Sequence, residues 1–273
     1  CGTSTAISVP CMFSVLPRAQ FDVDEADRYA NLLDALVDAG IDVEWRDNNA
    51  GCKGVCARVR TISYADRPDA RLCPAKHCYD EVMLGGLADR LRELRRDTVF
   101  VFHQIGSHGP AYFERYSAAA ERFSPACRSN QLQSCTAREI INAYDNTLLS
   151  TDAFLAAQIA LLQHNAEHID AALLYVSDHG ESLGEQGVFL HGMPYAFAPR
   201  TQKEVPMLLW TSSGFRERVG LGLGCMKEHV HEALSHDNLY HTVLGAAEVR
   251  NLAYDQRLDV LARCRRGQGR AAT

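Results

Sequence analysis

The sequence has no long apolar segment, no excess of basic residues and no repeated or low-complexity tract. Its apolar runs are as short as Ala171–Val176, whereas a helix that crosses a bilayer needs about 20 apolar residues. Lys and Arg number 28 against 34 Asp and Glu, and this net charge of −6 argues against a surface that coats nucleic acid. Because no Pro/Gly/Ser linker divides the chain, residues 1–273 are expected to form one soluble domain. The protein is expected to be a monomer.

Ten cysteines are the first informative residues of the sequence. Eight of them lie in closely spaced pairs: Cys1/Cys11, Cys52/Cys56, Cys73/Cys78 and Cys127/Cys135. Local pairs in an even total predict disulfides, which persist in oxidising compartments such as a bacterial periplasm. Cys225 and Cys264 remain, and a disulfide between them would close a much longer loop that nothing local aligns. The alternative is a zinc knuckle, although the spacings differ from its usual two-residue gap.

Apolar periodicity predicts helices that alternate with short strands. Helices are predicted over Ala26–Ala39, Tyr79–Arg96, Ala137–Asn165 and Leu239–Ala247, and strands over Ile41–Trp45, Thr98–His103, Ala171–Ser177 and Val205–Thr211. This order is typical of an α/β protein whose parallel or mixed sheet is covered by helices on both faces. In such sheets the ligand site lies beyond the carboxyl ends of the strands.

Histidine-rich segments follow two of these strands directly. His103 and His108 come at and after the end of one strand, Asp178 and His179 follow another, and His191 comes soon after. A carboxylate beside an imidazole suits zinc, so the sequence predicts a metal site where these segments converge. The alternative for the adjacent pair is that the aspartate caps a following helix and the histidine is a hydrogen-bonded loop residue.

The opening segment offers hydroxyl groups at a predicted helix N-terminus, which favours phosphate binding. Its hydroxyl residues are Thr3, Ser4, Thr5 and Ser8. A threonine bound to zinc loses its proton more easily than a free one and is then a competent nucleophile. The alternative is an ordinary helix cap rich in Ser and Thr.

Seven segments, in order along nearly the whole chain, carry a resemblance to a known family. They are Cys1–Ser14, Asp47–Val55, His103–Pro110, Asn142–Asn146, Ser177–Glu185, Leu190–Tyr195 and Ser235–Asn238. Together they resemble the lipid A phosphoethanolamine transferases, which include the mobile colistin-resistance enzymes. The resemblance implies an α/β/α sandwich of alkaline-phosphatase/sulfatase type with a mixed, mostly parallel sheet. It also implies that the domain is tethered by an N-terminal membrane domain and faces the periplasm at the bacterial inner membrane.

The resemblance assigns roles to individual residues. Thr5 takes the place of the nucleophile that becomes modified with phosphoethanolamine, and Thr5, Asp178 and His179 take the places of Zn²⁺ ligands. The residues implied to hold the substrate are Asn49, Lys53, His103, His108 and His191. One departure is that the family's remaining zinc ligand is a glutamate on a strand upstream of the nucleophile. We therefore expect that this chain lacks the membrane domain, that glutamate and the first sheet strand.

The reaction implied is a two-step exchange. The Thr5 alkoxide attacks phosphatidylethanolamine, diacylglycerol leaves, and an acceptor phosphate of lipid A or the lipopolysaccharide core then takes the group from the threonine. His108 or His191 is expected to protonate the leaving oxygen, and Lys53 to stabilise phosphoryl charge unless it is a solvated loop lysine. Such a transfer gives resistance to polymyxins.

Two other functions remain open. One is a secreted metal-dependent phosphodiesterase or sulfatase-like hydrolase, although Ser8–Met12 lacks the arginine of the usual sulfatase nucleophile motif. The other is a non-catalytic binding domain held together by disulfides, which would not require the Thr5 and Asp178 chemistry. The remaining histidines are expected to be exposed or packed, and Asp237 or Asn238 to cap the helix that follows them.

Overall fold

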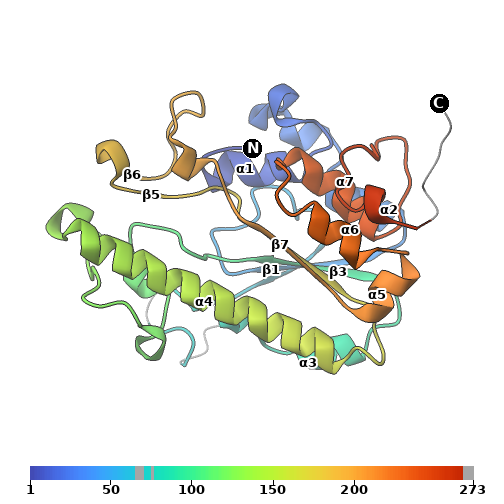
Figure 1. Ribbon diagram of the computed structural model, residues 1–273, viewed down its shortest axis with the longest axis horizontal. Coiled ribbons are helices and arrows are strands. Elements are labelled where there is room, and N and C mark those ends of the chain that lie inside the picture. Colours follow the sequence, from blue (N-terminus) through green and yellow to red (C-terminus); the bar gives the residue numbers. More distant parts are fainter. Residues whose placement is uncertain (65–70, 75–76, 267–273) are drawn as a thin grey trace.

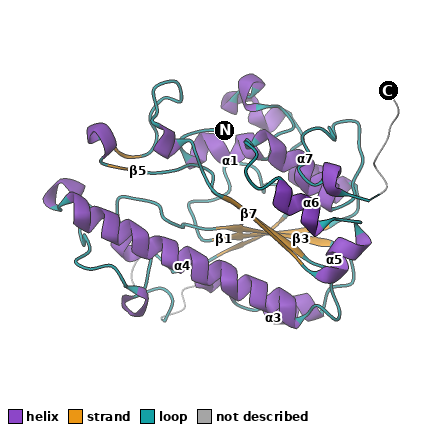
Figure 2. Cartoon of the chain, viewed as in Figure 1, coloured by secondary structure: helices purple, strands orange, loops and turns teal. Residues whose placement is uncertain are grey.

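Two groups of strands lie between two layers of helices in the computed structural model, which describes residues 1–64, 71–74 and 77–266 (Figure 1). One layer consists of α3 (Leu87–Arg92) and α4 (Ala137–His164), and the other contains α1 (Thr5–Met12), α2 (Leu32–Asp38) and α7 (Asp237–Ala246) (Figure 2). Two short helices, α5 (Ser213–Arg218) and α6 (Leu223–Glu228), complete this second side. The three-layer α/β/α arrangement confirms the predicted fold class.

The strands form a mixed set, as predicted. In one sheet β2 (Arg60–Ser63), β1 (Asp42–Asp47) and β3 (Thr98–His103) run parallel in that order. In another, β4 (Ala172–Val176) pairs antiparallel with β7 (Met207–Thr211), and a small hairpin joins β5 (Ser182–Leu183) to β6 (Phe189–Leu190). The strand β2 and the hairpin were not predicted, because neither has a run of apolar residues.

Two predicted helices are shorter than expected. The prediction over Ala26–Ala39 was wrong at its start: a 3₁₀ helix covers Val23–Arg28, and α2 begins only after Asn31. The reason is a capping box, in which Asn31 accepts hydrogen bonds from the helix and Asp34 accepts one in return from the Asn31 backbone. The prediction over Tyr79–Arg96 was wrong in the middle, where Gly86 takes a positive φ of 68° and separates a 3₁₀ helix from α3.

Long α4 matches its prediction to within one residue at its end. It begins at a second capping box, formed by Thr136 and Glu139. The predicted start of α7 was wrong, because the helix begins at Asp237 and so includes both predicted cap residues; its N-cap residue is the buried His236. At this end the Ser235 hydroxyl accepts a hydrogen bond from the Asp237 amide at 3.2 Å, and Asn238 Oδ1 accepts one from the Ser235 amide at 2.9 Å. No helix of the described ranges combines the length and hydropathy that a membrane span requires.

Apolar packing is concentrated on the α1, α2 and α7 side of the first sheet. Trp45 of β1 is 1% exposed and packs among Phe13, Leu33 and Leu244 from the surrounding helices. A smaller cluster on the other side of the sheet includes Phe154 of α4 and Met83 of the 3₁₀ helix Asp80–Leu84. Burial of such side chains contributes about 1.5–3 kcal/mol each, so these clusters fix the helices on both faces.

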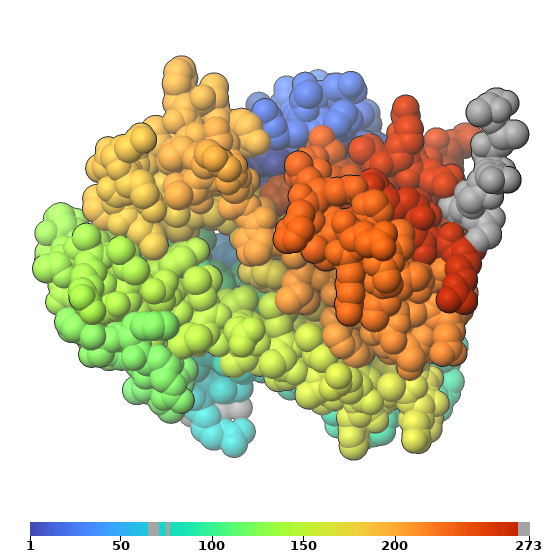
Figure 3. Space-filling view, in the orientation of Figure 1, coloured from blue at the N-terminus to red at the C-terminus, as the bar shows by residue number. Residues whose placement is uncertain are grey.

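The strands β3 and β4 do not pair with each other, and a cavity of about 1120 Å³ lies between them. We call it the interstrand cavity. It is lined by both strands and by residues of helices from both layers, among them Val101, Tyr175, Met12 and Leu155. At one end it reaches Thr5, His108 and His179. A hollow between α4 and the segment around residue 190 is visible on the surface (Figure 3).

Candidate active site

The predicted nucleophile meets the predicted metal ligands at the carboxyl end of β4. Thr5 is the first residue of α1, and its Oγ1 lies 3.2 Å from Nε2 of His179. The other ring nitrogen of His179 lies 3.0 Å from the Gly180 carbonyl oxygen, which only accepts. The neutral ring therefore carries its proton on Nδ1 and presents the lone pair of Nε2 toward the threonine.

Asp178 adds an oxygen to the same place. Its Oδ2 is buried without a hydrogen-bond partner among the described residues and lies 3.6 Å from Nε2 of His179. An unpaired buried carboxylate oxygen is costly unless a cation or a donor satisfies it. Threonine oxygen, carboxylate oxygen and imidazole nitrogen are together a suitable donor set for zinc. The helix-cap alternative for Asp178 is wrong, because a turn and the strand β5 follow it.

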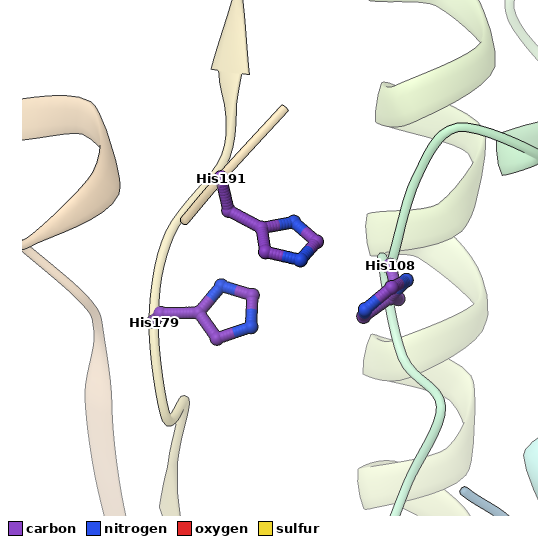
Figure 4. A group of neighbouring side chains, drawn as sticks. All are labelled: His108, His179 and His191. Carbon is purple, nitrogen blue, oxygen red and sulfur yellow. The ribbon is translucent and has the colours of Figure 1, made fainter. Parts of the chain in front are cut away.

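Three histidines from separate segments face one another beside this group (Figure 4). The ring centre of His191 lies 4.3 Å from that of His179 and 4.6 Å from that of His108. One ligand atom of each of the three lies within 4.8 Å of the others, so they form a second group that could hold a metal ion. Burial, together with the neighbouring His191, lowers the pKa of His108, which favours its neutral form.

Glu181 is a buried residue of this site that the sequence reasoning did not identify. Its carboxylate accepts hydrogen bonds from the Gly109 backbone (2.9 Å), the Tyr112 hydroxyl (3.2 Å) and Nδ1 of His191 (2.9 Å). The hydrogen bond to Glu181 raises the pKa of His191. Because Glu181 accepts the hydrogen bond from Nδ1, the other ring nitrogen of His191, Nε2, is left to face the site. The available signal was an acidic residue two positions after His179.

The predicted substrate residues divide into two groups in the structure. Asn49 and His103 line the interstrand cavity together with Thr5, at the ends of β1 and β3. Lys53 lies instead beside a shallow depression near Tyr29, and its ammonium group donates to the Ala50 carbonyl at 2.6 Å. The structure therefore does not bring the Lys53 ammonium into contact with Thr5, and its role in binding stays a prediction.

Asp47 connects the residues that follow β1 to the end of β3 by hydrogen bonds. It pairs with Nδ1 of His103 at 2.9 Å and accepts hydrogen bonds from the Trp45 ring and the Asn49 backbone. Burial alone would raise the pKa of the Asp47 carboxyl, but the hydrogen bonds from His103 and Trp45 outweigh it and the pKa is lowered. The aspartate thus fixes the turn that carries Asn49 against the end of β3.

All five predicted disulfides are present, and the described residues include no free cysteine. The bond between Cys225 and Cys264 is among them, although it spans 39 residues. Cys1–Cys11 joins the segment before α1 to the last turn of that helix, beside Thr5, and Cys52–Cys56 closes the loop that contains Lys53. These bonds exclude the zinc-knuckle alternative, which needs thiolates.

Two histidines outside the site, His236 and His241, are buried. His236 contacts the Ser177 carbonyl at 2.9 Å, and burial lowers its pKa to about 4. His241 accepts a hydrogen bond from the Asp255 backbone. Both rings pack within the fold, as expected for histidines outside the site.

The α/β/α layers, with candidate metal ligands directly after the strands, are those of a protein of the alkaline-phosphatase and sulfatase type. The sulfatase family model matches residues 1–249, and the chain belongs to this family. A protein of the alkaline phosphatase superfamily from Vibrio parahaemolyticus shares the fold, with a TM-score of 0.59 at 10% identity.

Within the family, the chain is similar to phosphoethanolamine transferases. It is 45% identical to phosphoethanolamine transferase EptA of Salmonella typhimurium over 97% of this chain and 49% of that protein. It is 44% identical to phosphatidylethanolamine transferase Mcr-1 of Escherichia coli over 91% of this chain and 46% of that protein. The chain thus spans about half the length of these relatives.

The structure agrees with that grouping. The soluble domain of lipooligosaccharide phosphoethanolamine transferase A from Neisseria meningitidis superposes with a TM-score of 0.94 at 41% identity, covering 97% of this chain and 80% of that one. The resemblance read from the seven sequence segments is therefore confirmed.

Proposed function

We propose that residues 1–273 form the catalytic domain of a zinc-dependent enzyme that transfers phosphoethanolamine from phosphatidylethanolamine to lipid A or the lipopolysaccharide core. The observation that carries the proposal is the 3.2 Å contact between Thr5 Oγ1 and His179 Nε2, beside the unpaired oxygen of Asp178. A nucleophile held against metal ligands is what phosphoryl transfer through a covalent intermediate requires. The names of the relatives at 41–45% identity support the choice of the transferred group.

The donor atoms fit zinc. Thr5, Asp178 and His179 would hold the ion, and the imidazoles of His108 and His191 lie beside them. When bound, zinc would favour the ionised threonine hydroxyl and offset negative charge on the phosphoryl oxygens. A related domain of E. coli EptC, at 20% identity, has been solved with zinc.

The protein groups account for the bonds that form and break. Thr5 Oγ1 bonds to phosphorus while the phosphorus–oxygen bond to diacylglycerol breaks, and His191, whose pKa is raised by its hydrogen bond to Glu181, gives a proton to the leaving oxygen. His108 is neutral with its proton on Nδ1, so its free Nε2 would accept a hydrogen bond from the substrate instead. A phosphate oxygen of the acceptor then attacks the same phosphorus and frees the threonine. Asn49 and His103 line the same cavity as Thr5, which supports their proposed contact with the substrate.

The relatives and the disulfides support a membrane setting for the proposed reaction. The N. meningitidis enzyme is described as an integral membrane protein, and a Campylobacter jejuni relative, 40% identical, as a C-terminal periplasmic domain. Five disulfides suit that oxidising compartment. We infer that this domain works at the periplasmic face of the inner membrane. Each transfer would add an ammonium group to a lipid phosphate, weaken the binding of cationic polymyxins and so confer resistance.

We also propose that an extended segment of the protein outside these 273 residues fills the interstrand cavity. The cavity is bounded by the unpaired edges of β3 and β4 and by apolar residues of the two helix layers, including Met12 and Leu155. A strand in this place would complete one continuous sheet. Its carboxyl end would arrive beside Asp178, where the resemblance implies a further glutamate ligand.

Intact-mass spectrometry tests the function. The zinc-loaded protein is incubated with phosphatidylethanolamine, and we expect one phosphoethanolamine group on Thr5 and release of diacylglycerol. The Thr5→Ala variant should remain unmodified. Turnover without an adduct would favour the hydrolase, and binding without turnover would favour a non-catalytic domain.

A further inference from the structure

The turn that carries His108 is held by an unusual number of hydrogen bonds from other parts of the chain. We call residues 104–109 the histidine turn. Its six members each hydrogen bond to another side chain: the Gln104 carbonyl to Asn49, the Ile105 and Gly106 amides to Asp80, Ser107 to Thr147, the His108 carbonyl to Arg115, and the Gly109 amide to Glu181. A loop that merely links two elements does not need this many external contacts.

Asp80 carries two of these contacts. Its two carboxylate oxygens accept from the amides of Ile105 (3.0 Å) and Gly106 (2.9 Å), and one also accepts from the Asn48 side chain at 2.7 Å. Gly106 has a positive φ of 54°, so the turn is sharp at this point. The carboxylate fixes both amides from outside the turn.

Arg115 forms a hydrogen bond to the same turn at His108. Its Nε donates to the His108 carbonyl at 3.1 Å, and the residue is only 9% exposed. Nη1 of the same guanidinium is buried and has no partner among the described residues. A buried cation with an unused donor is costly, so a purely structural explanation would favour an apolar side chain here.

These contacts fix the backbone that determines which ring nitrogen of His108 faces the site. Nδ1 of the ring donates to the Gly109 carbonyl at 2.7 Å, so Nε2 is the free nitrogen, and the ring lies opposite His179 and His191 (Figure 4). The direction of Nε2 is therefore set by the backbone of residues 105–109. Asp80 and Arg115 determine that backbone without touching the site themselves.

We propose that Asp80 and Arg115 are positioning residues that aim Nε2 of His108 at the reacting group. The importance of His108 for turnover rests on the proposed function, whereas the orientation of its ring does not. The two ideas therefore need separate measurements: imidazole signals report the ring, and turnover reports the reaction.

The test compares Asp80→Asn with Glu81→Gln, a change at its neighbour on the same 3₁₀ helix, whose side chain makes no hydrogen bond among the described residues. The asparagine amide cannot accept from the Gly106 backbone while its oxygen serves Ile105. We expect the His108 imidazole signals to shift in NMR spectra of histidine-labelled protein, those of His241 to stay, and kcat to fall about 10- to 100-fold with little change in KM. Glu81→Gln should behave as the parent protein.

Arg115→Lys provides a second approach from the other side of the turn, in case Asp80→Asn does not fold. It keeps the charge but removes the donor to the His108 carbonyl, and the same imidazole signals should shift. If a folded variant of either residue leaves the His108 signals and kcat unchanged, the proposal is overturned. If the signals shift while the parent protein itself shows no transfer, the positioning role stands and the proposed function fails.

Discussion

At the scale of single residues, the proposed nucleophile and the other proposed metal ligands offer donor atoms of unequal strength. Thr5 Oγ1 lies 3.2 Å from Nε2 of His179, while Asp178 Oδ2 has no hydrogen-bond partner in the part of the chain that the structure describes. A hydroxyl is a weak metal ligand compared with a carboxylate or an imidazole. Loss of the threonine and loss of the aspartate should therefore have different consequences.

We expect Thr5→Ala to abolish transfer while zinc content stays close to that of the parent protein. Asp178→Ala should lose zinc and transfer together, because it removes the anionic ligand. Metal analysis of the purified variants, alongside a transfer assay, measures both effects. Full transfer by Thr5→Ala would end the covalent mechanism.

A second prediction concerns Glu181, which touches the site only through other residues. Glu181→Gln keeps the shape but places an NH₂ group against one of its three donors, among them Nδ1 of His191. We expect turnover to fall about 10- to 100-fold with the fold retained. The exposed Glu93→Gln is the control, and equal turnover of the two variants would contradict the positioning of His191.

At the scale of elements, capping decides where α2 begins. Asp34 accepts from the Asn31 backbone at 2.7 Å and pairs with Arg58 at 2.5 Å. The Arg58 hydrogen bond lowers the pKa of the Asp34 carboxyl. A carboxyl with a lowered pKa in the folded state stabilises the fold above its unfolded pKa of 3.8, and this contribution is lost as the pH falls through the folded pKa.

We therefore expect Asp34→Asn to lower the free energy of unfolding by about 1 kcal/mol at pH 7, a modest value because Arg58 is half exposed. The difference from the parent protein should shrink as the pH is lowered below about 4. Urea unfolding at several pH values measures it. A difference that stayed constant down to pH 2 would show that the ionised carboxylate is not what stabilises α2.

At the scale of the whole molecule, the interstrand cavity of about 1120 Å³ leaves the core open between β3 and β4. Apolar side chains such as Val101 and Leu155 line it, and two strand edges border it. Filling it with a strand would bury several apolar side chains at about 1.5–3 kcal/mol each and pair both edges.

A form of the protein to which the proposed cavity-filling segment is added is thus expected to unfold at a temperature several degrees higher than the 273-residue chain. It should also bind less of the dye ANS, which reports exposed apolar surface. Thermal unfolding and dye fluorescence of the two forms provide the measurement. The same unfolding temperature and dye binding for both would show that the cavity is not filled by that segment.

The sequence by itself determined the class of fold and the disulfide pairs, and it predicted which residues carry the chemistry of the site. Apolar runs identified β3 and β4, a long amphipathic pattern identified α4, and the polar residues directly after the strands identified Asp178 and His179. These features depend on local periodicity and spacing, which are visible along the chain. The same local signals did not reveal the breaks at Asn31 and Gly86, because capping and a positive φ override apolar periodicity.

Only the tertiary structure decided which residues support the site and which stay away from it. Glu181 and Asp80 act through hydrogen bonds to turns far away in the sequence, and no spacing rule connects them. Lys53 was predicted to hold the substrate, and in the structure its ammonium group donates to the Ala50 carbonyl of its own loop. The unpaired edges of β3 and β4 likewise exist only in three dimensions, since strand pairing depends on the arrangement of the whole sheet.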